Sequence, residues 1–212
     1  SSMPYSVKLE PTNVCNLDCV FCDRKKVHYE EGFVAFDDFR KVFDQIKRNL
    51  YFCALELWGE PLLHKDICKI IRYIHDNNVA TYVSTNLNYL TDEIAEGLMK
   101  TGLDLLTIAV DGATQETYSK YRKDGDFSKV VENLRTLVRK KREVGSSTQI
   151  ELQFIVFRYN EHEVGKIKAL AKNIGVDSLK LRPGLTDNDE WVPKNRKYRY
   201  DSKKVARKRT CW

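Results

Sequence analysis

Short segments of alternating apolar and polar residues are each followed by a segment with helical spacing. Residues 5–12 alternate as a strand does, and residues 36–50 then place their apolar side chains at helical intervals. The pair recurs along the chain, and the predicted strands are 5–12, 54–58, 79–85, 104–110, 149–157 and 178–182. The predicted helices are 36–50, 67–77, 91–102, 114–144 with a break near Gly125, and 161–175. This alternation predicts a parallel sheet connected by right-handed helical crossovers.

Polar and turn-forming residues gather at the carboxyl end of each predicted strand. In chain order they are Cys15, Gly59 to Pro61, Ser84 to Asn86, Asp111 with Gly112, residues 158–160, and Arg182 with Pro183. Parallel strands bring their carboxyl ends to one edge, where α/β barrels and open sheets build their sites. We therefore expect a catalytic site at that edge.

The composition is typical of a globular domain followed by a short tail. The chain has 212 residues, of which 42% are hydrophobic and 31% charged. No stretch reaches the roughly 18 to 20 apolar residues of a membrane span, and the first residues lack the apolar core of a signal peptide. We expect a cytoplasmic protein without a membrane partner. In that reducing compartment, clustered cysteines are typically metal ligands or reactive thiols.

Three of the six cysteines, Cys15, Cys19 and Cys22, lie together in the segment VCNLDCVFCD. A structural zinc site needs four ligands, and His28 could complete a Cys3His set. A disulfide framework would leave an odd cysteine within the cluster. An iron–sulfur cubane held by three thiolates leaves one iron open to a non-protein ligand. The spacing favours the iron–sulfur cluster, and zinc stays as the alternative.

This loop resembles the defining loop of the radical S-adenosylmethionine (SAM) superfamily. Cys15-x-x-x-Cys19-x-Phe21-Cys22 matches it, including the aromatic residue before the third cysteine, and it follows a predicted strand. The resemblance implies that the three cysteines hold a 4Fe–4S cluster that acts with SAM, and it places Phe21 among the cofactor-binding residues. It also implies a fold, the partial (β/α)6 barrel of parallel strands with outer helices.

The segment WGEP, one β/α unit later, resembles a second element of the superfamily. The resemblance implies that Gly59, Glu60 and Pro61 hold the amino group of the methionine part of SAM. The residue chemistry agrees, because a carboxylate suits an ammonium, glycine allows close backbone approach, and proline fixes φ. By itself, GEP would be an ordinary turn with an exposed acid.

The ends of the third and fourth strands resemble the superfamily's polar contacts to ribose and substrate. In similar relatives a serine stands two residues before the strand-four Asp-Gly, whereas this chain has Ala109. We therefore predict that Ser84, Asn86 and Asp111 bind the cofactor. N-cap or turn roles are the structural alternative for these side chains.

The resemblance divides the chain into a radical SAM partial barrel, residues 1–185, and a basic linker, residues 186–212. The terminal segment with Cys211 resembles the start of the cysteine-rich extension of SPASM and twitch proteins, cut short. That reading implies auxiliary iron–sulfur clusters in the missing part. A stray cysteine near a terminus is the alternative.

The function implied by the resemblance is that of a radical SAM oxidoreductase or maturase, in which a reduced cluster cleaves SAM to a 5'-deoxyadenosyl radical. We expect oxidative modification or maturation of a peptide or protein. The alternative is dehydrogenation or rearrangement of a small polar metabolite such as a sugar. An electron donor such as flavodoxin or ferredoxin is the expected partner. The basic run 194–209 suggests RNA modification or RNA binding as another function, although without a base-reading motif a solvated linker is favoured.

Overall fold

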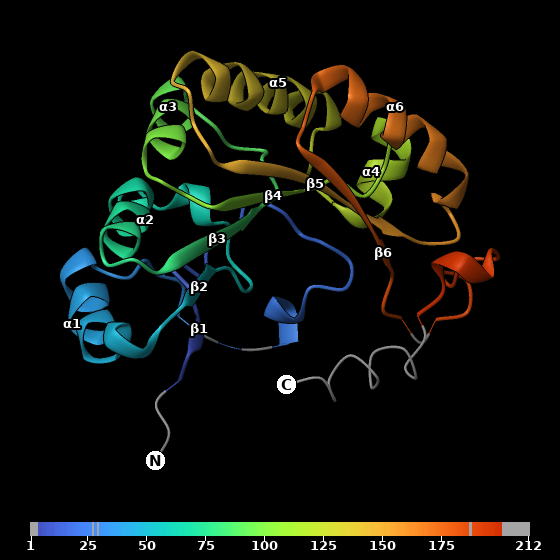
Figure 1. Ribbon diagram of the computed structural model, residues 1–212. Helices are drawn as coiled ribbons and strands as arrows, with labels where there is room; N and C mark the ends of the chain where they lie inside the picture. Colours follow the sequence, from blue (N-terminus) through green and yellow to red (C-terminus); the bar gives the residue numbers. More distant parts are fainter. Residues whose placement is uncertain (1–3, 27, 29, 187, 201–212) are drawn as a thin grey trace.

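The described residues form one parallel sheet that curves into an open half-barrel (Figure 1). The computed structural model describes residues 4–26, 28, 30–186 and 188–200. Neighbouring strands follow one another in chain order across the sheet. They are β1 Ser6–Leu9, β2 Phe52–Leu55, β3 Ala80–Thr85, β4 Leu105–Ala109, β5 Gln149–Val156 and β6 Ser178–Pro183. The predicted fold class, a partial α/β barrel of parallel strands with outer helices, is confirmed.

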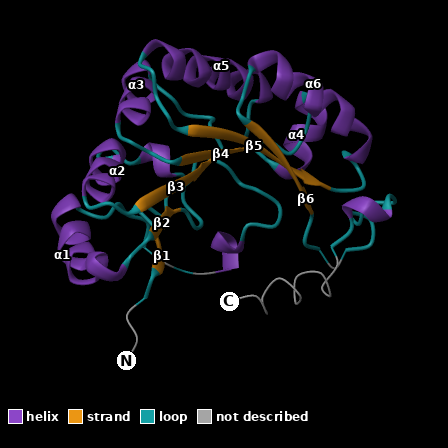
Figure 2. Cartoon of the chain, viewed as in Figure 1, coloured by secondary structure: helices purple, strands orange, loops and turns teal. Residues whose placement is uncertain are grey.

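The longer helices cover the convex side of the curved sheet (Figure 2). They are α1 Phe36–Ile46, α2 Ile67–Asp76, α3 Asp92–Lys100, α4 Gln115–Tyr121, α5 Phe127–Glu143 and α6 Val164–Ile174. Short 3-10 turns occur at η1 Asp23–Lys26, η2 Lys47–Asn49, η3 Pro61–Leu63, η4 Glu161–Glu163 and η5 Arg196–Tyr198. No helix within the described ranges combines the length and the apolar character that crossing a membrane requires.

Local sequence signals set several helix ends. The hydroxyl of Thr91 accepts a hydrogen bond from the amide of Ile94 at 3.2 Å, and Asp126 accepts one from the amide of Lys129 at 3.1 Å. Both side chains satisfy N–H groups that the first turn of a helix leaves without partners. Gly175 ends α6 at a φ of 82°, a left-handed conformation that favours glycine.

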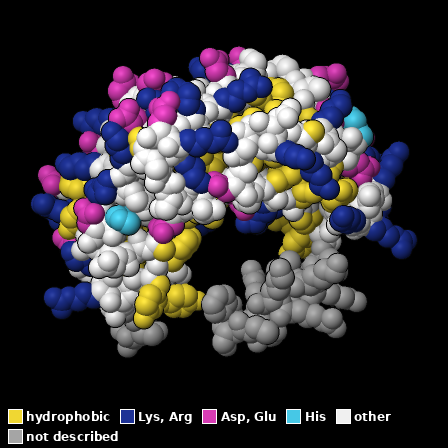
Figure 3. All heavy atoms as spheres, turned by 45° about the horizontal axis from the view of Figure 1, so that its top comes forward, with side chains coloured by type: hydrophobic (Ala, Val, Ile, Leu, Met, Phe, Trp, Pro, Cys, Tyr) yellow, Lys and Arg dark blue, Asp and Glu magenta, His cyan; other side chains and the backbone are white. Residues whose placement is uncertain are grey.

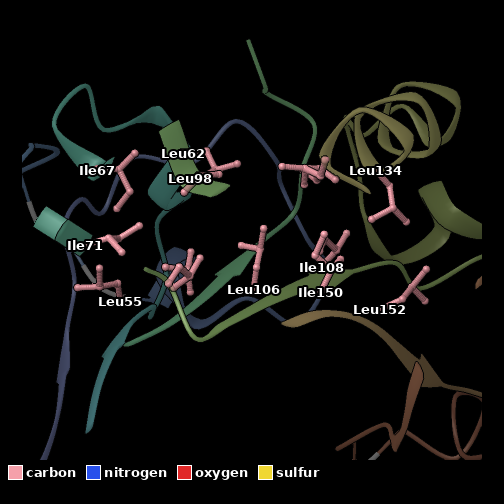
Figure 4. Close-up of a cluster of buried hydrophobic side chains, with 14 of the residues drawn as sticks. Leu55, Leu62, Ile67, Ile71, Leu98, Leu106, Ile108, Leu134, Ile150 and Leu152 are labelled. Atoms are coloured by element: carbon pink, nitrogen blue, oxygen red, sulfur yellow. The ribbon is translucent and has the colours of Figure 1, made fainter. Parts of the chain in front are cut away.

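The two faces of each strand carry different chemistry. Strand side chains on the convex face are buried against side chains of the helices. Figure 4 labels ten residues of this core, from strands and helices: Leu55, Leu62, Ile67, Ile71, Leu98, Leu106, Ile108, Leu134, Ile150 and Leu152. On the concave face polar residues lie side by side, because Ser84 pairs in register with Thr107, and Thr107 with Glu151. Parallel sheets are usually apolar on both faces. The polar concave face therefore indicates that something other than core packing occupies it.

The second strand begins and ends earlier than the sequence predicts. We expected residues 54–58, whereas β2 spans Phe52–Leu55. One carboxylate oxygen of Glu10 accepts hydrogen bonds from the amides of Trp58 and Gly59, at 2.8 and 3.1 Å. These bonds hold the chain after β2 in a loop that turns toward the end of β1.

The segment after β6 packs against the barrel over its described part. The amide of Arg158 donates to the carbonyl of Trp191 at 2.8 Å, and the Arg158 Nε donates to the carbonyl of Val192 at 2.9 Å. The Glu161 carboxylate accepts from the amides of Lys194 and Asn195 at 3.2 and 3.0 Å. Residues 191–195 are thus docked on the loop after β5. Cys211 lies outside the described residues, so the division at residue 185 and the extension remain predictions.

Candidate functional site

The loop that carries the cysteines crosses the concave side of the half-barrel and is fixed to the end of α4. The amide of Asp18 donates to the carbonyl of Lys123 at 3.2 Å, and that of Val20 to the carbonyl of Tyr121 at 3.0 Å. These two backbone hydrogen bonds therefore fix the position of the loop relative to the end of α4. Figure 3 shows that the described residues curve around a hollow.

A cavity of about 300 Å³ brings most of the predicted site residues together. The predicted residues on its wall are Cys15, Cys19, Phe21, Cys22, Gly59, Glu60, Ser84 and Asn86. The wall also contains Leu17, Asp23, Glu56, Leu57, Trp58, Thr85, Ala109, Tyr121, Arg122 and Gln153. Pro61 and Asp111, also predicted, are not part of this wall.

All three thiols are half-buried, and two of them receive hydrogen-bond donors. Burial raises the pKa of Cys15 to about 11, and burial also raises the pKa of Cys19. The side-chain amide of Asn86 donates to Cys15 Sγ at 3.8 Å, and the Arg122 guanidinium donates to Cys19 Sγ at 3.7 Å. Donors of this kind stabilise a thiolate over a thiol and tune the potential of a cluster bound to it.

The donor set fits an iron–sulfur cluster. Thiolates are the protein ligands of such clusters, and here three cysteine side chains line one cavity together with N–H donors. Within the described residues, no group of three His, Cys, Asp or Glu side chains is arranged around a position for a single metal ion. His28, the fourth ligand of the alternative zinc site, is exposed and is not part of the cavity wall.

Glu60 is buried beneath the cavity, and its carboxylate is held by three donors from the chain itself. Oε1 accepts from the Thr85 hydroxyl at 2.7 Å and from the Leu62 amide at 3.0 Å, and Oε2 accepts from the Asn86 amide at 2.7 Å. Burial raises the pKa of Glu60, and these hydrogen bonds oppose that rise. The carboxylate thus fixes the turn after β2 to the end of β3, a role that the sequence did not indicate.

Packing of the backbone around Gly59 leaves no room for a side chain. A Cβ at this position would lie 1.8 Å from the carbonyl oxygen of Thr12. The next amide, of Glu60, donates to the carbonyl of Val14 at 2.8 Å. The turn therefore packs directly on the start of the cysteine loop, and only a glycine permits this approach. Pro61 is buried at the first position of η3, where its fixed φ suits the turn.

Ser84 and Asn86 reach the cavity from the end of β3. Besides Cys15, the side-chain amide of Asn86 donates to Asn16 Oδ1 at 2.9 Å, while its own oxygen accepts from the Asn88 amide at 2.8 Å. Asn86 therefore connects the cysteine loop to the loop after β3. Ser84 lies on the concave face beside Thr107 of β4.

Asp111 lies behind the cavity and faces it only through Arg122. Its Oδ2 accepts from two guanidinium nitrogens of Arg122, both at 2.7 Å, and its Oδ1 accepts from the Ile155 amide at 2.7 Å. Burial lowers the pKa of Arg122, but the Asp111 carboxylate and Cys19 hold it well above its ordinary value. Sequence reasoning missed Arg122, because Asp111 and Cys19 are 11 and 103 residues away along the chain.

Aromatic rings close one side of the cysteine loop. The Phe21 ring centroid lies 4.9 Å from that of Trp191, 5.9 Å from Phe157 and 6.0 Å from Tyr121. The edge-to-face contact with Trp191 is a preferred aromatic geometry. Trp191 belongs to the docked segment after β6, so this segment completes the wall around the loop. The sequence offered no signal for this contact.

The fold is an open half-barrel of parallel strands, and one cavity at the carboxyl ends of the strands is lined by three cysteines and by the Gly59–Glu60 turn. Together they define the class of protein, an α/β-barrel enzyme that binds a cofactor. The chain belongs to the Radical SAM superfamily, because the model of that family matches residues 9–171. Membership implies a 4Fe–4S cluster and SAM as cofactors. The resemblance inferred from the cysteine loop is thereby confirmed.

Several similar proteins are named as probable GTP 3',8-cyclases. "Probable GTP 3',8-cyclase" of Saccharolobus islandicus is 26% identical over 176 residues, which are 82% of this chain and 55% of that protein. The protein of the same name from Methanocaldococcus jannaschii is 28% identical over 179 residues, 80% of this chain and 56% of that protein. The chain therefore spans about half the length of the curated relatives it matches.

Solved structures share the fold. The SAM-bound structure of Streptococcus suis SuiB superposes with a TM-score of 0.73 at 16% identity, over 97% of this chain and 46% of that one. Native anSMEcpe with bound AdoMet gives a TM-score of 0.70 at 17% identity, over 89% of this chain and 56% of that one. These likenesses support the half-barrel fold.

Proposed function

We propose that this chain holds a 4Fe–4S cluster through Cys15, Cys19 and Cys22 and binds SAM in the adjoining cavity. When bound together, these cofactors supply a 5'-deoxyadenosyl radical that removes a hydrogen atom from the substrate. The observation that carries the proposal is the shared cavity, in which the three thiols face the Glu60 turn. Membership in the superfamily supports the proposed chemistry, and the residues that line the cavity support the choice of ligands and binding residues.

The chain's own residues position these groups and limit the access of water. Asn86 and Arg122 direct N–H donors at two of the sulfur atoms, and the buried Asp111 fixes the orientation of the guanidinium. Glu60 holds the turn in place, which leaves backbone groups of that turn to meet the ammonium of SAM. Ser84 then offers a hydroxyl to the same cofactor. Preorganised donors of this kind need no rearrangement when the cofactors bind.

The test is anaerobic iron–sulfur reconstitution followed by reduction with dithionite in the presence of SAM. Chromatography should detect 5'-deoxyadenosine, and the product should be absent when Cys15, Cys19 or Cys22 is replaced by alanine. Dithionite takes the place of the proposed donor, a flavodoxin or ferredoxin. Colourless protein that retains one zinc after anaerobic purification would refute the cluster and favour the Cys3His alternative.

We infer that the substrate is a small polar metabolite, the alternative in the sequence analysis, in preference to a peptide. The relatives that are 26–28% identical carry a name that describes conversion of a nucleotide. The concave face is also polar, with Thr107 donating to Glu151 at 3.0 Å and Gln153 on the cavity wall. Turnover of a peptide, but of no small molecule, would reverse this choice. It would restore the oxidoreductase or maturase reading and the SPASM-type extension with auxiliary clusters.

RNA binding by the basic run 194–209 remains a separate proposal. Residues 194–200 are described and include the end of the docked segment, whereas residues 201–209 lie outside the described part. Retention on tRNA that falls steeply with salt and disappears when residues 201–212 are deleted would support it. Equal retention of the truncated chain would exclude a role for the tail.

A further inference from the structure

A second cavity adjoins the first beside the cysteine loop. Its volume is about 750 Å³, and the two cavities share the lining residues Phe21, Cys22, Asp23 and Tyr121. Its described wall also includes Lys25, Lys26, Phe157 and Arg182. A molecule in this second cavity would lie next to the proposed cofactor site, which is where a substrate for radical abstraction has to be.

Arg182 is the distinctive group on this wall. It occupies an inward-facing position of β6 and lies in register with Ile155 of β5. Its guanidinium donates to Gln153 Oε1 at 3.1 Å, and among the described residues no carboxylate forms an ion pair with it. Lys180, two residues earlier on the same strand, instead pairs with Glu151 at 3.5 Å. Arg182 therefore keeps its positive charge uncompensated at the cavity.

The Arg182–Gln153 pair presents mainly N–H donors to the cavities. Gln153 uses its oxygen on Arg182, so its NH2 group remains to face the first cavity, where Gln153 is part of the wall. Arg182 uses one of its five N–H groups on Gln153, and the others are available in the second cavity. Arg182 is exposed and is oriented by this one hydrogen bond, and a guanidinium can bind carboxylate or phosphate oxygens in a bidentate manner.

The surroundings of Arg182 suit an anionic group joined to a flat moiety. Lys25 and Lys26 line the same cavity and pair with Asp18 and Asp23, each at 2.7 Å, so the two aspartates offset the lysines and the net positive charge is that of Arg182. That charge attracts an anion such as phosphate. The rings of Phe21, Tyr121 and Phe157 on the same wall suit a flat, partly apolar moiety.

We propose that Arg182, oriented by Gln153, binds a phosphate group of the substrate and holds the substrate beside the cofactor cavity. Only the statement that the bound molecule is the substrate depends on the proposed function. Phosphate recognition is a property of the chain and can be measured without radical chemistry.

The experiment is calorimetric titration of the full chain, reconstituted and loaded with SAM, with three probes: GTP, inorganic tripolyphosphate and guanosine. Arg182→Gln is compared with Lys180→Gln, a matched loss of charge on the same face of the same strand. We expect GTP and tripolyphosphate to bind, with affinity reduced at least about tenfold by Arg182→Gln and little changed by Lys180→Gln. Guanosine should bind equally to all three proteins. Thermal unfolding checks that each variant is folded.

Tighter binding of GTP than of tripolyphosphate would assign the site to a nucleotide, and equal binding would assign it to phosphate alone. Gln153→Leu should weaken both probes by a smaller factor, because it frees the guanidinium without removing its charge. The proposal is overturned if neither phosphate probe binds, if Arg182→Gln binds them as well as the parent, or if Lys180→Gln weakens them equally. Arg182-dependent binding without formation of 5'-deoxyadenosine would refute the proposed function and leave this site standing.

Discussion

Adjacent residues of one strand show how differently the two faces of the half-barrel are used. On β5, Phe154 points to the helices and is completely buried among apolar side chains. Its neighbour Gln153 points to the concave side, lines the cavity and holds Arg182. The side chains of the convex face are fully packed within the chain, because helices cover this face. The concave face has polar groups that the chain alone does not fully use, which is expected where ligands complete the packing.

This comparison separates stability from chemistry along the same strands. Changes on the convex face should lower the free energy of unfolding and leave ligand binding intact in the molecules that remain folded. Changes on the concave side should do the reverse. Glu60 and Trp191 lie where the two functions meet, so each is expected to affect both quantities.

The largest effect on the concave side is expected for Cys19→Ala. We predict complete loss of the cluster, seen as loss of bound iron and of the broad absorption near ~400 nm, because one of three thiolate ligands is removed. The melting temperature of the metal-free protein should stay close to that of the metal-free parent, because the loop lies outside the core. Cys53→Ala, which alters a buried thiol of β2, is the matched control and should retain iron. Full iron content in Cys19→Ala would refute its role as a ligand.

The corresponding change on the convex face is Phe154→Ala. The ring is fully buried, so its loss should lower the free energy of unfolding by about 3–5 kcal/mol. Urea unfolding of the metal-free proteins measures this difference. Gln153→Ala, at the next position, should cost about 1 kcal/mol, because it removes mainly one hydrogen bond. Equal losses for the two variants would mean that the concave face is as important for stability as the core.

Glu60→Ala is expected to reduce both stability and cofactor binding. It leaves the buried amides of Asn86 and Leu62 without their acceptor, which should cost about 2–4 kcal/mol. The freed turn should bind SAM about tenfold more weakly, in line with one or two lost polar contacts, while the cluster is retained. Equilibrium dialysis with SAM and an iron assay measure the two parts. Unchanged affinity in a destabilised variant would show that the turn does not contact the cofactor.

Features encoded by local pattern could be predicted from the sequence. The alternation of strands and helices, the break near Gly125 and the cysteine loop each depend on neighbouring residues, and the structure places them as expected. The predicted end of β2 was wrong by three residues. Glu10, which follows β1, accepts hydrogen bonds from the amides of Trp58 and Gly59 and so holds these residues in a loop. Apolar pattern alone carries no information about such a contact.

The contacts that shape the site come from pairs far apart in the chain. Asp111 is predicted to bind the cofactor, and the structure adds that it pairs with Arg122, a residue that lines the cavity. Glu60 is predicted as a carboxylate for an ammonium, and the structure adds that its oxygens already accept hydrogen bonds from Thr85, Leu62 and Asn86. A motif gives the residue type needed at a site. Which of its atoms remain available depends on neighbours that only the fold brings together.

The smallest effect is expected for Trp191→Ala, on the segment that docks after β6. Trp191 is half-buried, and its ring contacts Phe21, Phe157 and Tyr159 at centroid distances of 4.9, 5.2 and 5.0 Å. Its loss should reduce stability by about 1–2 kcal/mol, because partly exposed aromatic contacts are removed without disturbing the core. Since Phe21 directly precedes Cys22, the cysteine loop should also become more accessible to solvent. The reconstituted cluster should then bleach faster in air than in the parent, whereas Trp191→Phe should restore most of the difference. Equal bleaching rates in the parent and Trp191→Ala would show that the docked segment adds stability to the barrel without shielding the site.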